Sequence, residues 1–397
     1  MIKDGGSASV FITAAGSKAV LSAIRSIGKQ KIRVVAGDVY KNSIGFCSKY
    51  CFKSFLYPSP ENEKIFIDAL YRVVKREGIE VLIPGHDDTT YVISKYKELF
   101  ENIVTVPIPN MEVLVKAYDK YKTILSAEEI GIPVPKTYHV ENEKDLRKLL
   151  KEVSYPLVIK PRFQNKGYGA YGVAYVYSSK ELLRIYSKIS FNDYVIQEFI
   201  PGGSEKMRMV NALFDKRSHL VAIFTAKKHR SHPITGGSTT LGESIWDPKL
   251  AELGMKLLKA WRWYGLAEME FKLDPRDGEL KLIEVNPRFW TYIDLPIACG
   301  VDFPYLLYKI AIGECVKPMK KYRIGVKFVN PIADPLVIFK ILMKSKDKIG
   351  MFRDLIMSYM GEKTYGLLSF EDPKPFLCEI LWNLCQFLQL NMIRKRI

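Results

Sequence analysis

The first 110 residues alternate short apolar runs with segments of helical periodicity. Apolar runs bounded by turn-forming residues are typical of buried strands, and the segments between them repeat apolar positions every three to four residues, as helices do. Strands separated by helices predict βαβ units and a parallel sheet. The sequence therefore predicts an open α/β domain over 1–110. The predicted strands are 9–15, 32–38, 80–85 and 103–109, and the predicted helices are 17–27, 62–77 and 89–99.

The pattern then changes. A helical segment over 111–130 ends at Gly131-Ile132-Pro133, a combination that stops helices. The strands that follow are separated mainly by hairpin or glycine-rich turns, which is an α+β pattern. We therefore expect a second domain over 111–318, with a lid subdomain at about 125–195 and a central subdomain at about 196–318.

Residues 319–397 are predicted to form a C-terminal helical extension. Its last helix gathers apolar side chains on one broad side and ends in Arg394-Lys395-Arg396. It either packs on the preceding domain or lies on a membrane surface as an amphipathic helix. Polar residues along it, such as Glu379 and Gln386, argue against a helix that spans a bilayer. The predicted helices are 334–345, 352–360 and 376–397.

The chain carries a formal net charge of +17. Such a charge attracts nucleic acid, anionic lipid or an anionic small molecule. The basic residues are spread along the chain, with short clusters only at 344–348 and at the C-terminus. No nucleic-acid-binding motif accompanies them. We therefore expect no specific nucleic-acid partner and prefer a basic surface that attracts polyphosphate.

The six cysteines lack the spacing of a metal site. Cys47 and Cys51 are four residues apart, but no second pair or histidine lies at the distance that a zinc site needs. Free or buried thiols in a reducing compartment are the better interpretation. No secretory leader and no apolar run of about 18 residues is present. We therefore expect a cytoplasmic protein.

A glycine loop follows the apolar strand 156–161. Gly167, Gly169 and Gly172 have the spacing G-x-G-x-x-G, but a strand follows them, whereas a dinucleotide fingerprint requires a helix there. The kinase motifs that accompany a similar loop are also absent. A strand–loop–strand flap can close its backbone N–H groups over phosphates. Lys160, at the end of the first strand, is placed to bind phosphate, although a hairpin without a ligand is the simpler alternative.

The strongest signal is a predicted hairpin of two strands, 267–273 and 279–285. Because side chains alternate along a strand, its polar and apolar residues separate onto two faces. A face of buried carboxylates would be strongly repulsive unless a hard divalent cation bound to it. Arg288, just beyond the hairpin, can contact a phosphate through two hydrogen bonds. The alternative is a solvated edge hairpin. The predicted polar face holds Glu268, Glu270, Glu284 and Asn286, and the predicted core face holds Met269, Phe271, Ile283 and Val285.

The strand that ends at Gln197-Glu198 leads into a glycine turn. Backbone groups of Phe199 and Ile200 can read an adenine edge, with Glu198 accepting from the amino group, and Glu205 can hold ribose hydroxyls. Taken alone, this stretch is simply a strand and a turn.

The order of these elements resembles the ATP-grasp superfamily, particularly single-module relatives of the carbamoyl phosphate synthetase large subunit. The resemblance covers nearly all of 1–318, and its most specific motif is Glu284-Val285-Asn286-Pro287-Arg288, with Glu270 14 positions before Glu284. It implies a pre-ATP-grasp Rossmann-like domain followed by an ATP-grasp fold. The implied roles are phosphate binding by Lys120 and Lys160, nucleoside binding by Glu198, Phe199, Ile200 and Glu205, one or two Mg²⁺ (Mn²⁺ being acceptable) on Glu270, Glu284 and Asn286, and phosphoryl stabilisation by Arg288.

Departures from that pattern narrow the resemblance. There is one such module, no glutaminase-partner region is recognisable, and Trp290 stands where the synthetases carry a small residue. A full carbamoyl phosphate synthetase is excluded. The stretch from Pro287 to Pro304 is closer to D-aspartate ligase-like amino acid ligases. The resemblance therefore implies an ADP-forming carboxylate–amine ligase that acts on small molecules, with a homo-oligomer as one arrangement it allows.

Several residues are candidates for binding substrate. Asp87 and Asp88 lie at the carboxyl end of a predicted strand, where α/β domains bind ligands, although capping of the next helix also explains them. Lys228 and Arg230 form part of a basic run that can stabilise anions, and Gly237 lies in a loop that can close on a substrate.

Two other functions stay open. One is an enzyme that makes an acyl phosphate or carboxyphosphate for an acceptor other than an amine. The other is a basic protein without catalytic activity that docks on a membrane or nucleic acid.

Overall fold

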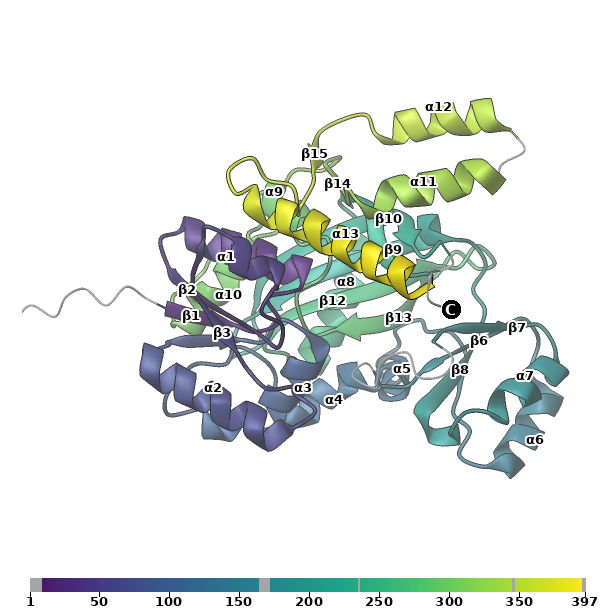
Figure 1. The fold of residues 1–397 in the computed structure, drawn as a ribbon. Helices are drawn as coiled ribbons and strands as arrows, with labels where there is room; N and C mark the ends of the chain where they lie inside the picture. The colour runs from purple at the N-terminus through teal and green to yellow at the C-terminus, as the bar shows by residue number, and fades with distance from the viewer. Residues whose placement is uncertain (1–8, 164–171, 235, 345–346, 395–397) are drawn as a thin grey trace, which may run out of the picture.

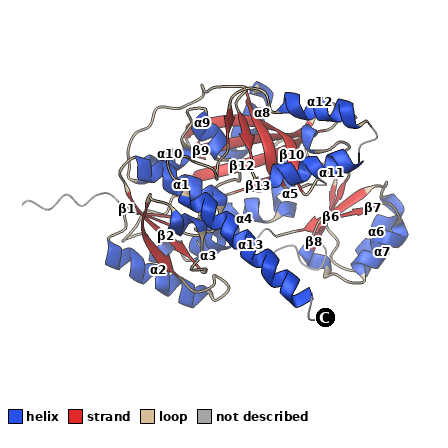
Figure 2. Cartoon of the chain, turned by 45° about the horizontal axis from the view of Figure 1, so that its top comes forward, coloured by secondary structure: helices blue, strands red, loops and turns tan. Residues whose placement is uncertain are grey.

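The computed structural model describes residues 9–163, 172–234, 236–344 and 347–394. Three sheets organise these residues, and helices cover them (Figures 1 and 2). The α/β architecture with a C-terminal helical segment agrees with the predicted fold class. The division at 110 and 318 is kept as a proposal. The separate N-terminal sheet supports the first boundary, whereas residues 327–329, beyond the second, pair with the central sheet.

The N-terminal unit contains the predicted parallel sheet. The strand order β3-β2-β1-β4 places β1 in the interior, where its residues are completely buried. The carboxyl ends of β1 and β4 are neighbours, so the turn after β4 opens at the edge where α/β sheets bind ligands. The elements are β1 (Ser9–Ile12), α1 (Lys18–Lys29), β2 (Arg33–Asp38), η1 (Ile44–Cys47), β3 (Cys51–Leu56), α2 (Glu63–Glu77), β4 (Val81–Ile83), α3 (Asp87–Lys95) and η2 (Lys97–Leu99).

Two details of this unit differ from the prediction. The segment 103–109 is not a strand, because it pairs with β4 only through a single bridge between Thr105 and Val81. Pro107 and Pro109 lack the backbone N–H groups that a β-ladder requires, which explains why this segment does not form the predicted strand. The pattern also gave no sign of β3, an edge strand whose side chains are mostly exposed and so lack an apolar run.

The predicted helix over 111–130 is two helices, α4 (Met111–Tyr118) and α5 (Lys120–Glu129). The break occurs at Asp119, whose backbone is extended and whose carboxylate accepts hydrogen bonds from the N–H groups of Tyr121 and Lys122. Asp119 is thus the N-cap of α5, a role that a short acidic side chain favours over the helix interior.

A small antiparallel sheet forms the next unit. Its strand order is β5-β8-β6-β7, and its two helices share a core with it. In Figure 1 this unit stands apart at the lower right and faces the end of the large sheet. Its elements are β5 (Thr137–Tyr138), α6 (Glu143–Glu152), β6 (Leu157–Pro161), β7 (Ala174–Val176), α7 (Ser179–Tyr186), η4 (Phe191–Asp193) and β8 (Tyr194–Glu198).

A seven-stranded sheet forms the centre of the molecule, in the order β13-β12-β9-β10-β11-β14-β15. Alternate residues of β9 serve different cores: Met209 and Leu213 pack with the N-terminal unit, whereas Val210 and Phe214 pack with the core that includes α8. The sheet is therefore buried on both faces. Its elements are η5 (Ser204–Lys206), β9 (Met207–Phe214), β10 (Leu220–His232), β11 (Ser238–Ile245), α8 (Pro248–Ala260), β12 (Gly265–Leu273), β13 (Leu280–Asn286), α9 (Asp294–Ala298) and α10 (Phe303–Ala311).

The C-terminal segment contains the three expected helices, α11 (Ala333–Lys344), α12 (Lys348–Ser358) and α13 (Lys374–Arg394). It also adds two short strands that the sequence pattern did not predict, β14 (Lys327–Val329) and β15 (Lys363–Thr364), and β14 extends the central sheet beside β11. None of the helices in the described ranges is both long enough and apolar enough to cross a bilayer.

The chain before α13 is bound to the N-terminal unit. Asp372 accepts hydrogen bonds from Arg25 Nε, at 3.0 Å, and from Ser48 Oγ, at 2.6 Å. A disulfide joins Cys47 in η1 to Cys378 in α13. The expectation of free thiols was wrong for these two cysteines, because residues 331 positions apart in sequence meet when α13 packs against η1.

Candidate functional site

The hairpin of β12 and β13 presents the expected polar face. Glu268 lies opposite Asn286, and Glu270 lies opposite Glu284. A register shift follows this second pair, so that Phe271 pairs with Leu282. The prediction that Ile283 points into the core was therefore wrong: the bulge leaves Ile283 half-buried, and Leu282 fills the core. The four polar residues all lie on the same side of this register shift, away from the turn, and therefore keep their common face.

These carboxylates lie in a buried environment. Burial and the charge of Glu270 raise the pKa of the Glu268 carboxyl, and burial likewise raises the pKa of Glu270. Burial acts in the same direction on Glu284, but the nearby amines of Lys120 and Lys160 outweigh it and hold the pKa of Glu284 below its usual value. Acidic groups with perturbed pKa values in one buried cluster are typical of functional sites.

Three lysines surround the cluster. Lys160 Nζ, at the end of β6, donates to the carbonyl of Ile283 at 3.2 Å, and burial lowers the pKa of this amine to about 8. Lys120 Nζ lies 3.9 Å from Glu284 Oε2, and Lys228 Nζ lies 3.2 Å from Glu270 Oε2. The lysines come from α5, β6 and β10, so the small sheet and the large sheet both contribute positive charge to one place.

The lysine of α5 is fixed by a contact with the small sheet. Arg162, just after β6, donates to both carboxylate oxygens of Asp119 at 2.9 and 2.7 Å. The N–H of Lys120 also donates to the carbonyl of Arg162 at 2.9 Å. Because these bonds join the start of α5 to the end of β6, they keep the amines of Lys120 and Lys160 on the same side of Glu284.

The N-terminal unit contributes Asp87. Arg288 Nε donates to Asp87 Oδ2 at 2.8 Å, and its NH2 group lies 3.4 Å from Asn286 Oδ1. Asp87 is only 8% exposed, and its other oxygen, Oδ1, has no hydrogen-bond partner in the described part of the chain. A buried oxygen of this kind carries a desolvation cost that a ligand can relieve.

The segment predicted to bind the nucleoside is placed beside the cluster, but many of its polar groups have partners. Glu198 pairs with Arg276 at 3.0 Å and with Lys281 at 3.3 Å. The carbonyl of Ile200 accepts from Lys272 Nζ at 2.7 Å, and the N–H of Phe199 donates to the carbonyl of Pro156. Glu205, which is exposed, accepts from the N–H of Gly203 at 3.0 Å. Binding of a nucleoside here stays a prediction.

The other expected residues divide into two groups. Gly237 joins the cluster, because its carbonyl accepts from Lys228 Nζ at 3.2 Å. Arg230 points elsewhere and binds Asp334 of α11 and Ser358 of α12, while Asp88 pairs with the exposed His86. Gly172 lies shortly before β7, and Gly167 and Gly169 lie outside the described residues.

Tyr292 was missed by the sequence reasoning. Its hydroxyl group contacts the side chain of Asn211 at 3.2 Å, and it is close enough to Glu268 to affect the pKa of both groups. Asn211 lies on β9 and is completely buried. Only the pairing of β9 with β12 places these residues together, so no local signal in the sequence identifies them.

Geometry alone does not make this cluster a complete metal site. Within the described ranges, no three His, Cys, Asp or Glu side chains converge closely enough to hold a metal ion. The oxygen set of Glu270, Glu284 and Asn286 nevertheless suits Mg²⁺, which takes only one or two carboxylates from proteins and completes its shell with water and substrate phosphates.

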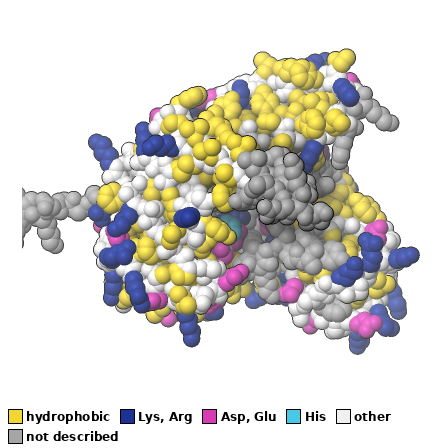
Figure 3. Space-filling model, viewed as in Figure 1, with side chains coloured by type: hydrophobic (Ala, Val, Ile, Leu, Met, Phe, Trp, Pro, Cys, Tyr) yellow, Lys and Arg dark blue, Asp and Glu magenta, His cyan; other side chains and the backbone are white. Residues whose placement is uncertain are grey.

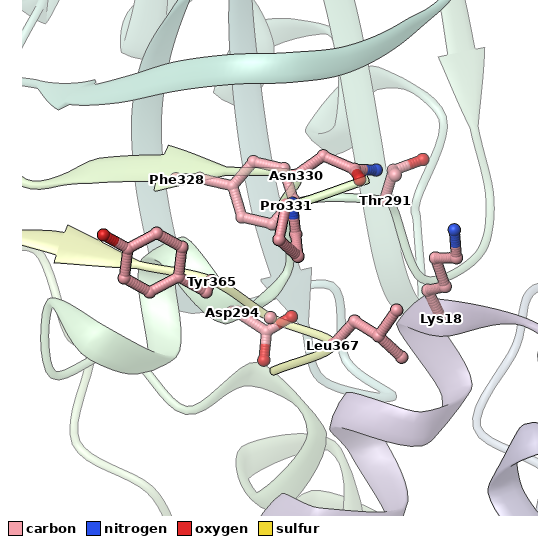
Figure 4. Close-up of a pocket in the computed structure, with 9 residues that line it drawn as sticks. Lys18, Thr291, Asp294, Phe328, Asn330, Pro331, Tyr365 and Leu367 are labelled. Carbon is pink, nitrogen blue, oxygen red and sulfur yellow. The ribbon is translucent and has the colours of Figure 1, made fainter. Parts of the chain in front are cut away.

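A separate small cavity lies between α1, β14 and the chain after β15 (Figure 4). Its volume of about 10 Å³ is enough for roughly one water molecule. The buried carboxylate of Asp294 reaches this region and accepts from Ser22 Oγ at 2.6 Å. The cavity is too small for a substrate and shares no lining residue with the cluster.

Comparison with known proteins agrees with this geometry. Residues 117–292 match the family model described as an ATP-grasp domain. The chain contains an ATP-grasp domain. That domain spans the small sheet and the strands β9 to β13, and therefore includes all three lysines and the hairpin of the cluster.

Curated relatives extend the likeness beyond the ATP-grasp domain. A D-aspartate ligase of Enterococcus faecium is 25% identical over 255 residues, which cover 58% of this chain and 59% of the relative. A carbamoyl phosphate synthase large chain of Methanobrevibacter smithii is 27% identical over 204 residues, which cover 49% of this chain but 19% of the relative. The match therefore spans well under two thirds of each relative.

The ATP-grasp fold is also seen among solved structures. The N5-carboxyaminoimidazole synthetase of Staphylococcus aureus, complexed with ADP, superposes with a TM-score of 0.68 over 89% of this chain and 97% of that chain, at 14% identity. At this identity the likeness concerns the fold alone.

Proposed function

We propose that this protein is an ADP-forming ligase that activates a small-molecule carboxylate with ATP and joins it to an amine. The observation that carries the proposal is the half-buried pair Glu270–Glu284, which lies close to Lys120 of α5, Lys160 of the small sheet and Lys228 of the central sheet. Such a concentration of opposite charges costs desolvation energy, and it is expected where a polyanion and a cation are bound together.

In this proposal each residue has a defined role toward ATP. Lys120 and Lys160 bind its phosphates, the segment Glu198–Ile200 holds adenine, and Glu205 holds the ribose hydroxyls. Glu198 already binds Arg276 and Lys281, so part of its effect on adenine binding would be exerted through these two side chains. Gly167, Gly169 and Gly172 form the flap that covers the phosphates.

Glu270, Glu284 and Asn286 would hold Mg²⁺, as one or two ions, with Mn²⁺ as an alternative. The metal would supply charge neutralisation along the phosphates, which lowers the barrier to phosphoryl transfer. Lys228, which neutralises Glu270 in this structure, would also be available for the γ-phosphate.

The reaction would proceed in two displacements. A carboxylate oxygen attacks the γ-phosphorus in line, the bond to the β-phosphate oxygen breaks, and ADP leaves. The amine nitrogen then attacks the acyl carbon and loses a proton. The bond between that carbon and the phosphate oxygen breaks, and inorganic phosphate leaves with its electron pair. Arg288 and Lys160 stabilise the negative charge that develops on the transferred group. Asp87, with its unpartnered oxygen beside Arg288, would hold the amine.

The D-aspartate ligase relative supports an amino acid-like pair of substrates. It is 25% identical over 58% of this chain, and its name describes a ligase that acts on an amino acid. The proposal further includes a cytoplasmic location, a homo-oligomer, contact of the C-terminal helix with a membrane, and no specific nucleic-acid partner.

An ADP-release screen across acids and amines tests this function. We expect release with at least one pair in the presence of Mg²⁺, and its near-complete loss in Glu284→Ala. Glu279→Ala is the matched control, because Glu279 lies on the same hairpin but is paired, among the described residues, with the exposed Lys249 alone. Turnover in Glu284→Ala at the wild-type rate would refute the metal assignment.

The carbamoyl phosphate synthase relative favours one alternative. An enzyme that forms an acyl phosphate or carboxyphosphate for a different acceptor would use the same cluster. ADP release that persists when every amine is omitted would favour this alternative. A non-catalytic protein would show no ADP release with any pair of substrates.

A further inference from the structure

Three C-terminal helices expose apolar side chains at helical spacing. In α12, Ile349, Phe352 and Ile356 follow one another at intervals of three to four residues, and Ile349 is 87% exposed. Residues separated by three or four positions lie on one side of a helix. Each helix therefore carries an uncovered apolar stripe. The others are Leu336, Phe339 and Met343 in α11, and Leu377, Leu381 and Leu384 in α13.

The stripes lie on the same face of the molecule. Figure 3 shows hydrophobic side chains gathered over α11, α12 and the first part of α13. Phe370, just before α13, is 94% exposed. Monomeric proteins seldom leave so much contiguous apolar surface uncovered, and such patches mark sites of interaction.

The hairpin of α11 and α12 is attached through polar contacts. Arg230, on β10, binds Asp334 through Nε and NH2 at 2.9 and 2.6 Å and binds Ser358 Oγ at 2.8 Å. Val337 and Leu355 are the buried hydrophobic side chains among those described on these two helices. The attachment therefore fixes the inner side of the hairpin and leaves the apolar stripes pointing outward.

The charges beside the stripes are mainly positive. Lys340, Lys348 and Lys374 are exposed on the three helices. The acidic side chains of the same helices are engaged. Asp334 binds Arg230, Asp347 caps α12, Asp354 lies 3.8 Å from Arg353, and Glu379 binds Lys18 at 3.1 Å.

We propose that α11, α12 and α13 form a docking surface for a membrane that carries anionic headgroups. Apolar stripes rimmed by lysine are the composition of helices that lie in the plane of a bilayer, with aromatic and aliphatic side chains in the acyl boundary and cations at the headgroups. A second copy of the chain fits less well, because a twofold contact would bring the same lysines face to face. The proposal does not depend on the reaction assigned to the ATP-grasp domain.

Vesicle flotation tests the docking surface. The full chain is mixed with phosphatidylcholine vesicles or with vesicles that also contain phosphatidylglycerol, and the fraction that floats is measured at low and high salt. We expect binding to the phosphatidylglycerol vesicles, weakened by salt. Phe352→Glu with Ile356→Glu should reduce the partition coefficient roughly tenfold or more. Lys340→Glu with Lys348→Glu should remove the preference for anionic lipid.

A matched control distinguishes this surface from general stickiness. Ile65→Glu removes a side chain that is 51% exposed on α2, away from the three helices, and should leave flotation unchanged. Equal loss in this control, or equal binding to neutral and anionic vesicles, would overturn the proposal. Light scattering provides a further test. The proposal would also be overturned if the wild type were a dimer and the Phe352→Glu, Ile356→Glu variant were a monomer whose flotation is unchanged. A thermal melt close to that of the wild type confirms that each variant is folded.

Discussion

Arg288 and Asp87 form a 2.8 Å ion pair between the end of the β12–β13 hairpin and the first turn of α3. The two residues are 201 positions apart in sequence and follow strands of different sheets, β13 and β4. Burial lowers the pKa of the Arg288 guanidinium, but Asp87 outweighs this effect and holds the pKa above its usual value. The pair therefore orients Arg288 toward Asn286 and makes the N-terminal unit part of the proposed site.

Asp87→Asn should reduce kcat/KM for ADP release by about 10- to 100-fold, the loss expected when a charge-assisted hydrogen bond of roughly 1.5 to 3 kcal/mol is weakened. The measurement is steady-state ADP release at saturating ATP. Asp68→Asn is the control, because Asp68 forms an exposed pair with Arg72 in the same unit. If Asp87→Asn and Asp68→Asn behave alike, the ion pair has no part in the reaction.

Lys228→Met should destabilise the protein by about 3 to 5 kcal/mol, because it leaves the buried Glu270 carboxylate without its partner. Adding Mg²⁺ with a non-hydrolysable ATP analogue should restore part of the lost stability, since the metal would replace the missing positive charge. Thermal denaturation with and without these ligands measures the effect.

Lys227→Met is the natural comparison for that variant. Lys227 is adjacent on β10, but its pair with Glu243 is partly exposed, so the cost should stay below about 1 kcal/mol. A Lys228→Met protein with an unchanged melting temperature would show that Glu270 is not held as an ion pair.

Asp274 makes the stability of the hairpin dependent on pH. Hydrogen bonds from Arg276 outweigh burial, and with the amine of Lys281 they hold the pKa of this carboxyl well below its usual value. A folded-state pKa below the unfolded one means that the stabilisation is complete above the unfolded pKa and is lost as pH falls toward the folded pKa. The wild-type protein should therefore lose stability below about pH 4.

Asp274→Asn should cost about 2 to 3 kcal/mol at neutral pH and should flatten this acid-dependent loss. Urea unfolding across the acid range provides the measurement. Asp277→Asn changes an exposed carboxylate of the same turn and should leave the unfolding curves close to those of the wild type. Parallel curves for wild type and Asp274→Asn would contradict the assignment.

Arg25→Ala should release the chain that precedes α13. Arg25 donates to the carbonyls of Gly366 and Asp372 at 2.8 and 2.7 Å, as well as to the Asp372 carboxylate. Losing these contacts leaves a buried carboxylate unpaired, so we expect much faster proteolytic cleavage between about residues 359 and 373. Lys29→Ala, which breaks only the exposed pair with Glu371, should leave the cleavage rate unchanged.

The sequence predicted the polar face of the β12–β13 hairpin better than the contacts around it. The face formed by Glu270, Glu284 and Asn286 follows from strand alternation and a short turn, both of which are local properties. The contact of Lys228 with Glu270 depends on the strand order of the central sheet, and that of Asp87 with Arg288 depends on how the N-terminal unit packs on this sheet. No periodicity contains that information. Arg230 was misjudged for the same reason, since two residues from Lys228 it binds the C-terminal helices.

The fold shows the same division between local and distant causes. Long helices with a clear apolar side, such as α1 and α2, were predicted close to their observed bounds. The segment 103–109 was mistaken for a strand, because apolar content outweighed the effect of its two prolines. β14 and β15 are short strands that exist only because the central sheet offers an edge to pair with, so their three and two residues give no signal alone.

The pairing of β14 with β11 decides where this polypeptide can be shortened. β14 pairs with the outer edge of β11 at Leu241, Gly242 and Glu243. If the chain were ended near residue 318, those backbone groups would form an open template for another molecule, and open sheet edges recruit further strands. The C-terminal segment thus acts as a cover against aggregation, and expression of residues 1–318 by itself should give insoluble material.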